Sequence, residues 1–68
     1  MSFPAFSRVV RAGFGQRRKS LRNSLEPLVG SSERAEQLLR RAGIDPGARP
    51  ESLDVEAFVA ITRALESD

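Results

Sequence analysis

The sequence predicts a small all-α domain of about four short helices, and three features of the chain indicate this fold class. Apolar residues recur at the 3.6-residue period of a helix, capping residues and glycines divide the chain, and β-branched residues never alternate as in a strand. Sixty-eight residues make one domain at most, and without cysteine that domain has no disulfide framework. We therefore expect residues 1–68 to fold as a single compact helical domain.

The first predicted helix carries an apolar stripe made of Phe3, Phe6, Val9, Val10 and Gly13. Pro4 suits its first turn, where a missing N–H costs nothing. Arg8 and Arg11 lie one turn apart on the opposite face, so this helix is predicted to have one buried face and one cationic face.

The second predicted helix carries a stripe made of Phe14, Leu21, Leu25 and Leu28. Gly13 and Gly15 either separate it from the first helix or bend one long helix. Gly30 suits the left-handed position after its last turn, while Pro27 lies near the end and can stop the helix early.

The third predicted helix opens at Ser31 or Ser32, both good N-caps, and its apolar face consists of Ala35, Leu38, Leu39 and Ala42. Glu33 and Glu36 follow the cap, where we interpret them as complementing the helix dipole. Gly43 followed by apolar Ile44 is typical of a Schellman stop.

The fourth predicted helix follows a tight turn at Asp45-Pro46-Gly47 and begins with Asp54 as N-cap. Leu53 and Phe58 have the spacing of a hydrophobic staple. The predicted inner face consists of Val55, Phe58, Val59, Thr62 and Leu65.

Charge is strongly divided along the chain. Residues 1–25 contain six cationic side chains and no acidic one, whereas residues 26–68 contain five arginines and nine carboxylates. Such polarity indicates a polyanionic partner. The candidate RNA-binding residues are Arg8, Arg11, Arg17, Arg18, Lys19 and Arg22. No aromatic residue is expected to be exposed among them, so phosphate and shape recognition is favoured over base stacking.

Other interpretations of these cations stay open. The same residues can form a solvated helix face that binds nothing. Arg17 lies at the edge of the apolar stripe, where it suits packing or contact with another domain equally well. Asn23 can read RNA, but a role on the helix surface or in capping is an alternative.

The chemistry of an enzyme is missing from this chain. It has no histidine to activate Ser20 or Ser24, no metal-ligating constellation, and no glycine-rich phosphate loop. Gly13-Phe14-Gly15 is too short to be a dinucleotide-binding glycine motif, and it follows a predicted helix rather than a strand. We therefore expect no catalytic residue and no cofactor in this chain. No apolar stretch approaches the roughly 20 residues of a membrane span, and no secretion signal is evident. The absence of cysteine fits a cytoplasmic protein.

The order of residues adds a resemblance to this interpretation. Residues 6–25, with Val10-Arg11-Ala12, Phe14 and the run from Gln16 to Leu25 (QRRKSLRNSL), resemble the start of the C-terminal helical domain of the ribosomal RNA adenine dimethyltransferases. The resemblance continues through residues 36–39 and 42–46, then through Arg49, Glu51, Leu53 and residues 56–58. It covers nearly the whole chain, and the RRK-S-L-x-N-S-L core is its most specific part. Pro50 stands where a small residue other than proline is expected.

The resemblance implies a larger parent protein. Members of that family place an S-adenosylmethionine-dependent catalytic domain of Rossmann type before this module. They methylate N6 of two adjacent adenosines near the 3′ end of small-subunit ribosomal RNA. Their cofactor loop and Asn-Pro-Pro-Tyr-like motif do not occur here, so no catalytic or cofactor-binding residue carries over. By this resemblance the chain is a C-terminal docking domain and the catalytic domain is absent from it.

The family's docking role carries over onto Arg17, Arg18, Lys19 and Arg22, and further onto Arg8 and Arg11. The implied partners are small-subunit ribosomal RNA, the small ribosomal subunit and the parent's own catalytic domain; we expect a monomer and no membrane. Two rival functions remain from the residues themselves. One is a free-standing DNA-binding helical protein, and the other is a structural module that packs its cationic face on an acidic partner domain.

Overall fold

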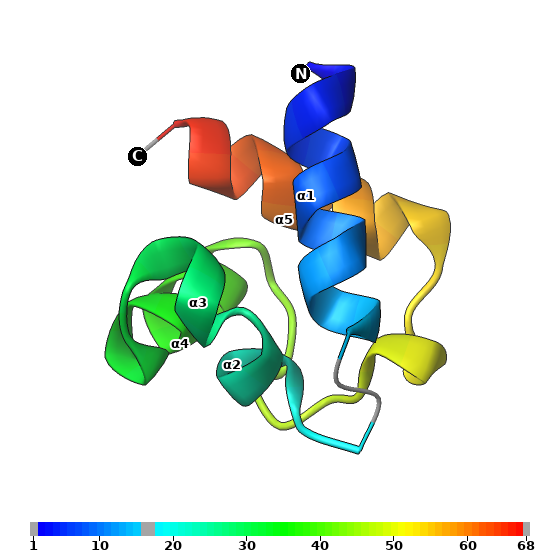
Figure 1. Ribbon diagram of the computed structural model, residues 1–68. Helices are drawn as coiled ribbons and strands as arrows, with labels where there is room; N and C mark the ends of the chain where they lie inside the picture. The colour runs from blue at the N-terminus through cyan, green and yellow to red at the C-terminus, as the bar shows by residue number, and fades with distance from the viewer. Residues whose placement is uncertain (1, 16–17, 68) are drawn as a thin grey trace.

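A computed structural model describes residues 2–15 and 18–67 of the chain, and the part it describes is helical without a strand (Figure 1). The all-α fold class predicted from the sequence is confirmed. The elements in order are α1 (Phe3–Phe14), α2 (Leu21–Ser24), α3 (Glu26–Val29), α4 (Ser32–Arg41), the 3₁₀ helix η1 (Pro50–Ser52) and α5 (Val55–Glu66).

Helix α1 crosses α5, and the two share the most extensive helix interface of the fold (Figure 1). The other half contains α2, α3 and α4: α4 packs against α2 and α3 within this half and against α5 of the first half. The buried apolar core joins both halves and consists of Val9, Leu21, Leu25, Ala35, Leu38, Leu39, Phe58 and Ile61. Because α2 supplies a buried leucine and a second one follows it directly, the short helix after the cationic segment is fixed to the core.

The start of α1 and the end of α5 are joined by hydrogen bonds. The backbone N–H and the hydroxyl of Ser2 donate to Oε2 of Glu66, at 3.2 and 3.3 Å. The same hydroxyl accepts from the N–H of Ala5 and so caps α1, while Pro4 occupies the first turn as predicted.

The apolar stripe of α1 is confirmed at its centre and wrong at its start. Val9 and Gly13 are buried, but Phe3 is 79% exposed because it lies in the first turn, beyond the reach of the core. A Cβ atom on Gly13 would lie 3.2 Å from Cε1 of Phe58, so glycine permits the close approach of α1 to that ring.

The predicted second helix is wrong in extent. Phe14 is the last residue of α1, where its ring packs 5.5 Å from that of Phe58. It is 38% exposed, so the expectation that no aromatic residue is exposed among the cations is wrong. The helical turns that follow the cations begin only at Leu21 and are divided at Leu25 into α2 and α3. Pro27 explains the division, because it has no N–H to donate to the carbonyl oxygen of Asn23.

The predicted ends of the other helices are confirmed. Gly30 (φ +99°) ends α3, and Ser31 caps α4 by accepting from the N–H of Arg34 at 3.2 Å. At the other end of α4, Ile44 N–H donates to the carbonyl of Leu39 at 2.8 Å and Gly43 adopts φ +77°. This bond and this left-handed glycine are typical of a Schellman stop.

Helix α5 begins as predicted, and its predicted inner face is confirmed at Phe58, Thr62 and Leu65 but wrong at Val55. The Asp54 carboxylate accepts from the N–H of Ala57 at 2.9 Å, and Leu53 packs against the core. Val55 is 68% exposed, whereas Ile61, absent from the predicted inner face, is fully buried. Buried Thr62 donates its hydroxyl proton to the carbonyl of Phe58 at 2.8 Å.

Candidate nucleic-acid interface

The structure describes five of the six predicted cationic residues, and all five are exposed. They are Arg8 and Arg11 on α1, Arg18 and Lys19 in the connection that leads to α2, and Arg22 on α2. Arg17 lies outside the described residues. Arg18 and Lys19 stand beyond the end of α1 rather than on a continuous second helix, so they occupy a connection and not the helical arc that the sequence predicted.

The first turn of α2 is capped by backbone from another part of the chain. Ser20 makes no side-chain cap bond. Instead the N–H groups of Leu21 and Arg22 donate to the carbonyl oxygens of Ala48 and Pro46, at 2.8 and 3.2 Å. Two of the donors that every helix start leaves without an intrahelical partner are satisfied in this way.

The capping carbonyls belong to the tight turn that the sequence predicted. Ala48 N–H donates to the carbonyl of Asp45 at 3.0 Å, and the side chain of Asp45 accepts from Gly47 N–H at 2.9 Å. The second contact is an Asx turn, which holds the turn backbone in shape. The turn after α4 therefore holds the segment that carries the cations.

Burial of one side gives α2 a fixed orientation. Leu21 and Leu25 are fully buried and Ser24 is 2% exposed, whereas Arg22 and Asn23 face solvent. With one side of α2 packed in the core, Arg22 stays at the surface beside α4. The exposure of Asn23 leaves both of its predicted roles, RNA contact and a place on the helix surface, untested.

Glu36 lies between two arginines. Its Oε1 is 3.7 Å from Nε of Arg22, and its Oε2 is 3.5 Å from Nε of Arg40. Of the two glutamates interpreted as complementing the dipole, Glu33 does lie in the first turn of α4, but Glu36 lies beyond it and forms these ion pairs. No role was predicted for Arg40 from the sequence. Glu36 and Arg40 nevertheless have the i,i+4 spacing at which opposite charges pair on one helix.

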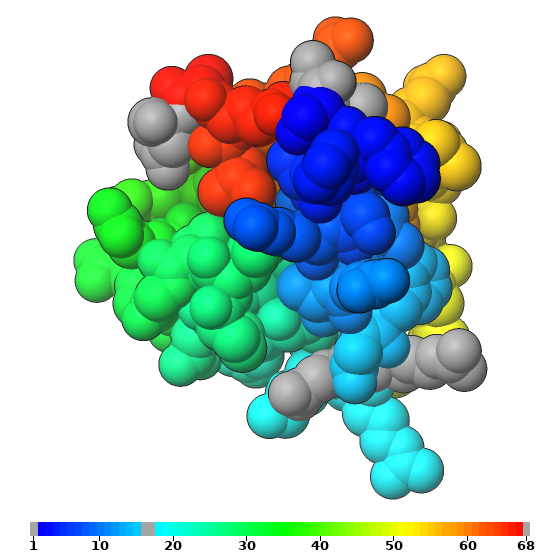
Figure 2. Space-filling view, turned by 45° about the horizontal axis from the view of Figure 1, so that its top comes forward, coloured from blue at the N-terminus to red at the C-terminus, as the bar shows by residue number. Residues whose placement is uncertain are grey.

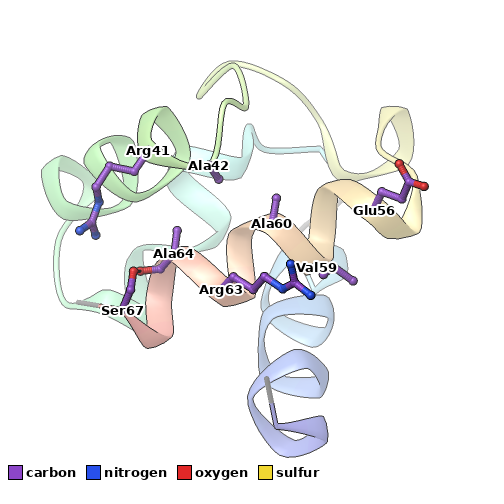
Figure 3. Close-up of a pocket in the computed structure, with 8 residues that line it drawn as sticks. All are labelled: Arg41, Ala42, Glu56, Val59, Ala60, Arg63, Ala64 and Ser67. Atoms are coloured by element: carbon purple, nitrogen blue, oxygen red, sulfur yellow. Dashed lines mark hydrogen bonds between the residues drawn. The ribbon is translucent and has the colours of Figure 1, made fainter.

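A shallow hollow of about 550 Å³ lies between the end of α4 and one face of α5 (Figure 3). Its lining is made of Arg41, Ala42, Glu56, Val59, Ala60, Arg63, Ala64 and Ser67. None of the five described cationic residues lines it. Glu56 is the one carboxylate in this lining.

Neither a metal-binding cluster nor a membrane-spanning helix is found among the described residues. Within residues 2–15 and 18–67 no group of three metal-ligating side chains occurs, and no helix is long and apolar enough to cross a membrane. The same ranges contain no strand, so the strand–glycine loop–helix unit that would hold S-adenosylmethionine is not among them.

The chain is similar in sequence to part of several curated proteins. It is 52% identical over 65 residues to a protein of Paramagnetospirillum magneticum, 47% over 57 residues to one of Lactobacillus helveticus, and 50% over 60 residues to one of Caldanaerobacter subterraneus. Each is named ribosomal RNA small subunit methyltransferase A.

These matches cover 96%, 84% and 88% of the chain but 22%, 19% and 22% of the relatives, so the chain spans about a fifth of their length. No family model and no solved structure matches it. The resemblance to ribosomal RNA methyltransferases that the sequence indicated is confirmed by these identities.

Proposed function

We propose, because this chain is homologous to about a fifth of the ribosomal RNA small subunit methyltransferase A proteins, that it is the RNA-docking module of such an enzyme. In this proposal the module binds small-subunit ribosomal RNA and performs no chemistry. The rest of the parent protein, which we place before it in the chain, binds S-adenosylmethionine and transfers methyl groups to two adjacent adenosines in the cytoplasm.

One observation carries the proposal: two adjacent exposed cations, Arg18 and Lys19, closely precede a helix whose start is anchored to the rest of the fold. Exposed guanidinium and ammonium groups keep their charge available for phosphates, and binding releases the counterions of the RNA. The anchored helix limits where the connection can lie, which reduces the ordering cost of binding. The absence of acidic residues before Glu26 keeps the local potential positive.

The length of α2 disfavours the rival DNA-binding function. A recognition helix must extend along the major groove, and α2, the helix that follows Arg18 and Lys19, has four residues and is about 6 Å long. The cations instead lie on a connection and on two different helices. Such a distributed arrangement suits contacts with the backbone of structured RNA, whose deep major groove side chains cannot read.

The proposal is tested by titrating the ¹⁵N-labelled chain with a hairpin of small-subunit ribosomal RNA and, in parallel, with duplex DNA of equal length. We expect shifts around residues 8–11 and 18–23 that are larger with the RNA. Doubly reversing charge with Arg18→Glu and Lys19→Glu should lower the salt slope of log affinity by about 0.7 to 0.9 for each phosphate that the variant no longer neutralises. The matched control reverses Arg34 and Arg63, which are exposed on α4 and α5.

An equal decrease of affinity in both double variants would show generic electrostatics and refute an RNA-specific surface. Equal affinity for the two nucleic acids would favour the DNA-binding rival. Absence of binding to either, together with burial of Arg18 in the parent enzyme, would favour a module that packs on an acidic partner domain.

A further inference from the structure

The two arginines joined by Glu36 come from helices that are separate in sequence but packed together. Arg22 belongs to α2 and Arg40 to the last turn of α4. One carboxylate pairs with both, with a different oxygen for each. Because both Nε atoms contact the same carboxylate, the two arginine side chains lie close to each other.

The carboxylate is less exposed than either of the two cations. The side chain of Glu36 is 37% exposed, against 47% for Arg22 and 68% for Arg40. Both ion pairs are made by Nε, at the inner end of each guanidinium group. The Nη groups at the outer end carry most of the five N–H donors of arginine, in the planar arrangement that matches phosphate oxygens.

The backbones of both arginines are held by the same stretch of chain. Arg22 N–H donates to the carbonyl of Pro46, and the carbonyl of Arg40 accepts from Gly43 N–H at 3.1 Å. The Schellman stop and the turn that follows it thus hold the backbones of the two arginines. Glu36 holds their side chains. Such preorganisation lowers the entropy decrease that accompanies ligand binding.

We infer that Glu36 holds Arg22 and Arg40 as a pair that binds backbone phosphates of RNA, which extends the docking surface from the connection onto α4. The inference rests on the proposed function. Two positive charges beside one negative charge leave the site cationic, and exposed ion pairs of this kind contribute little to folding. In the pair Glu36 is a positioning residue, and Arg22 and Arg40 contact the ligand.

The surface around the pair supports this extension. Figure 2 shows residues near position 20 projecting from the lower edge of the molecule. Arg22 follows shortly after that projecting stretch, and α2 packs on α4. Helix α2 therefore lies after the connection with Arg18 and Lys19 in the chain and next to α4, which carries Arg40, in the packing.

The test compares Arg40→Gln with Arg34→Gln, which removes the same charge from the same helix outside the pair. Binding to a hairpin of small-subunit ribosomal RNA is measured across a salt series. We expect Arg40→Gln to weaken binding several-fold and to lower the salt slope by about 0.7 to 0.9, the value for one phosphate, while Arg34→Gln does neither. Nε–H signals of Arg22 and Arg40 should shift when the RNA is added.

Glu36→Gln separates positioning from charge. Removal of a negative charge alone would tighten RNA binding and leave the effect of Arg40→Gln unchanged. If Glu36 positions the pair, Arg40→Gln should cost less affinity in the Glu36→Gln background than in the original chain. Additive effects would contradict the positioning role.

The outcomes distinguish this inference from the proposed function. If Arg18→Glu with Lys19→Glu weakens RNA binding but Arg40→Gln behaves like Arg34→Gln, the pair is not part of the surface and the docking function stands. If the original chain does not bind the RNA, both fail together. Shifts of the two Nε–H signals with duplex DNA and not with RNA would also overturn the inference.

Discussion

The backbone N–H of Arg22 donates to the carbonyl oxygen of Pro46 across 3.2 Å, so a residue of the cationic segment is held by a turn that comes after α4 in the chain. The neighbouring bond from Leu21 to Ala48 has the same direction. Two stretches that stood out separately in the sequence, the described part of the first (residues 18–25) and residues 42–46, are therefore joined by a backbone hydrogen bond. The second ends α4 and leads into the turn that caps the helix of the first.

Gly43→Ala should weaken the backbone cap of α2 without creating a steric clash. A Cβ atom at Gly43 meets nothing within 4 Å, so the cost is that of placing alanine at φ +77°, about 1–2 kcal/mol of unfolding free energy. Urea denaturation measures this decrease, and amide exchange at Leu21 and Arg22 should accelerate. Gly47→Ala, at a residue without positive φ, is the control and should retain stability.

Phe58→Ala should be among the most damaging single changes. Its ring is 4% exposed, packs on Phe14 and lies against Gly13, so truncation leaves a cavity and costs about 3–5 kcal/mol. In so small a domain this destabilisation is expected to unfold much of the population, which circular dichroism detects. Phe3→Ala removes the same ring from a position that is 79% exposed and should change stability by less than about 0.5 kcal/mol.

Gly13→Val should destabilise the domain by about 1–3 kcal/mol. The added Cβ would lie 3.2 Å from the Phe58 ring and 3.5 Å from Leu21, and the methyl groups of valine need still more room. Thermal unfolding measures the destabilisation. Arg11→Val places the same β-branched side chain at an exposed position of the same helix and accounts for the cost of branching alone; an equal effect in both variants would contradict close packing at Gly13.

Asp54→Ala should cost about 1 kcal/mol, because the N–H of Ala57 then has no acceptor at the start of α5. Asp54→Asn retains an acceptor oxygen at the cap and should preserve most of the stability. Destabilisation of equal size in the two variants would show that charge near the helix dipole, rather than the hydrogen bond, stabilises this end. Chemical denaturation of both variants separates the two effects.

Glu36→Gln should change the free energy of unfolding by less than about 1 kcal/mol. The carboxylate and both arginines are more than a third exposed, and water screens such pairs. Denaturation at low and high salt measures the contribution, which should shrink as salt increases. A large destabilisation would mean that the pair serves the fold rather than a ligand.

Local chemistry in the sequence was enough to predict the fold class and most helix ends. Ser31, Gly43 and Asp54 each act through bonds between residues a few positions apart, and those bonds do not depend on the rest of the fold. Periodicity predicted less well which apolar residues are buried. It places Phe3 and Val55 on the inner faces of their helices, yet both are exposed. Both residues lie in first turns, and whether a neighbouring helix covers a first turn depends on how the helices pack.

The candidate site was predicted in composition but not in geometry. The apolar spacing of Phe14 and Leu21 suggested one long cationic helix, whereas Phe14 completes α1 and the helix that follows starts at Leu21. The contact of Glu36 with Arg22 joins helices α2 and α4 and depends on how they pack, which no local pattern encodes. The predicted RNA-binding role of all six cations stays a prediction.

The hydrogen bonds between Ser2 and Glu66 bring the two ends of the described chain to one pole of the molecule. A chain joined to either end would leave from this pole, where α1 starts and α5 finishes (Figure 1). The cationic connection lies beyond the opposite end of α1, about 18 Å along the axis of this 12-residue helix. If a further domain is joined at this pole, as we propose, its tether would raise the local concentration of the cations near whatever lies about one helix length away.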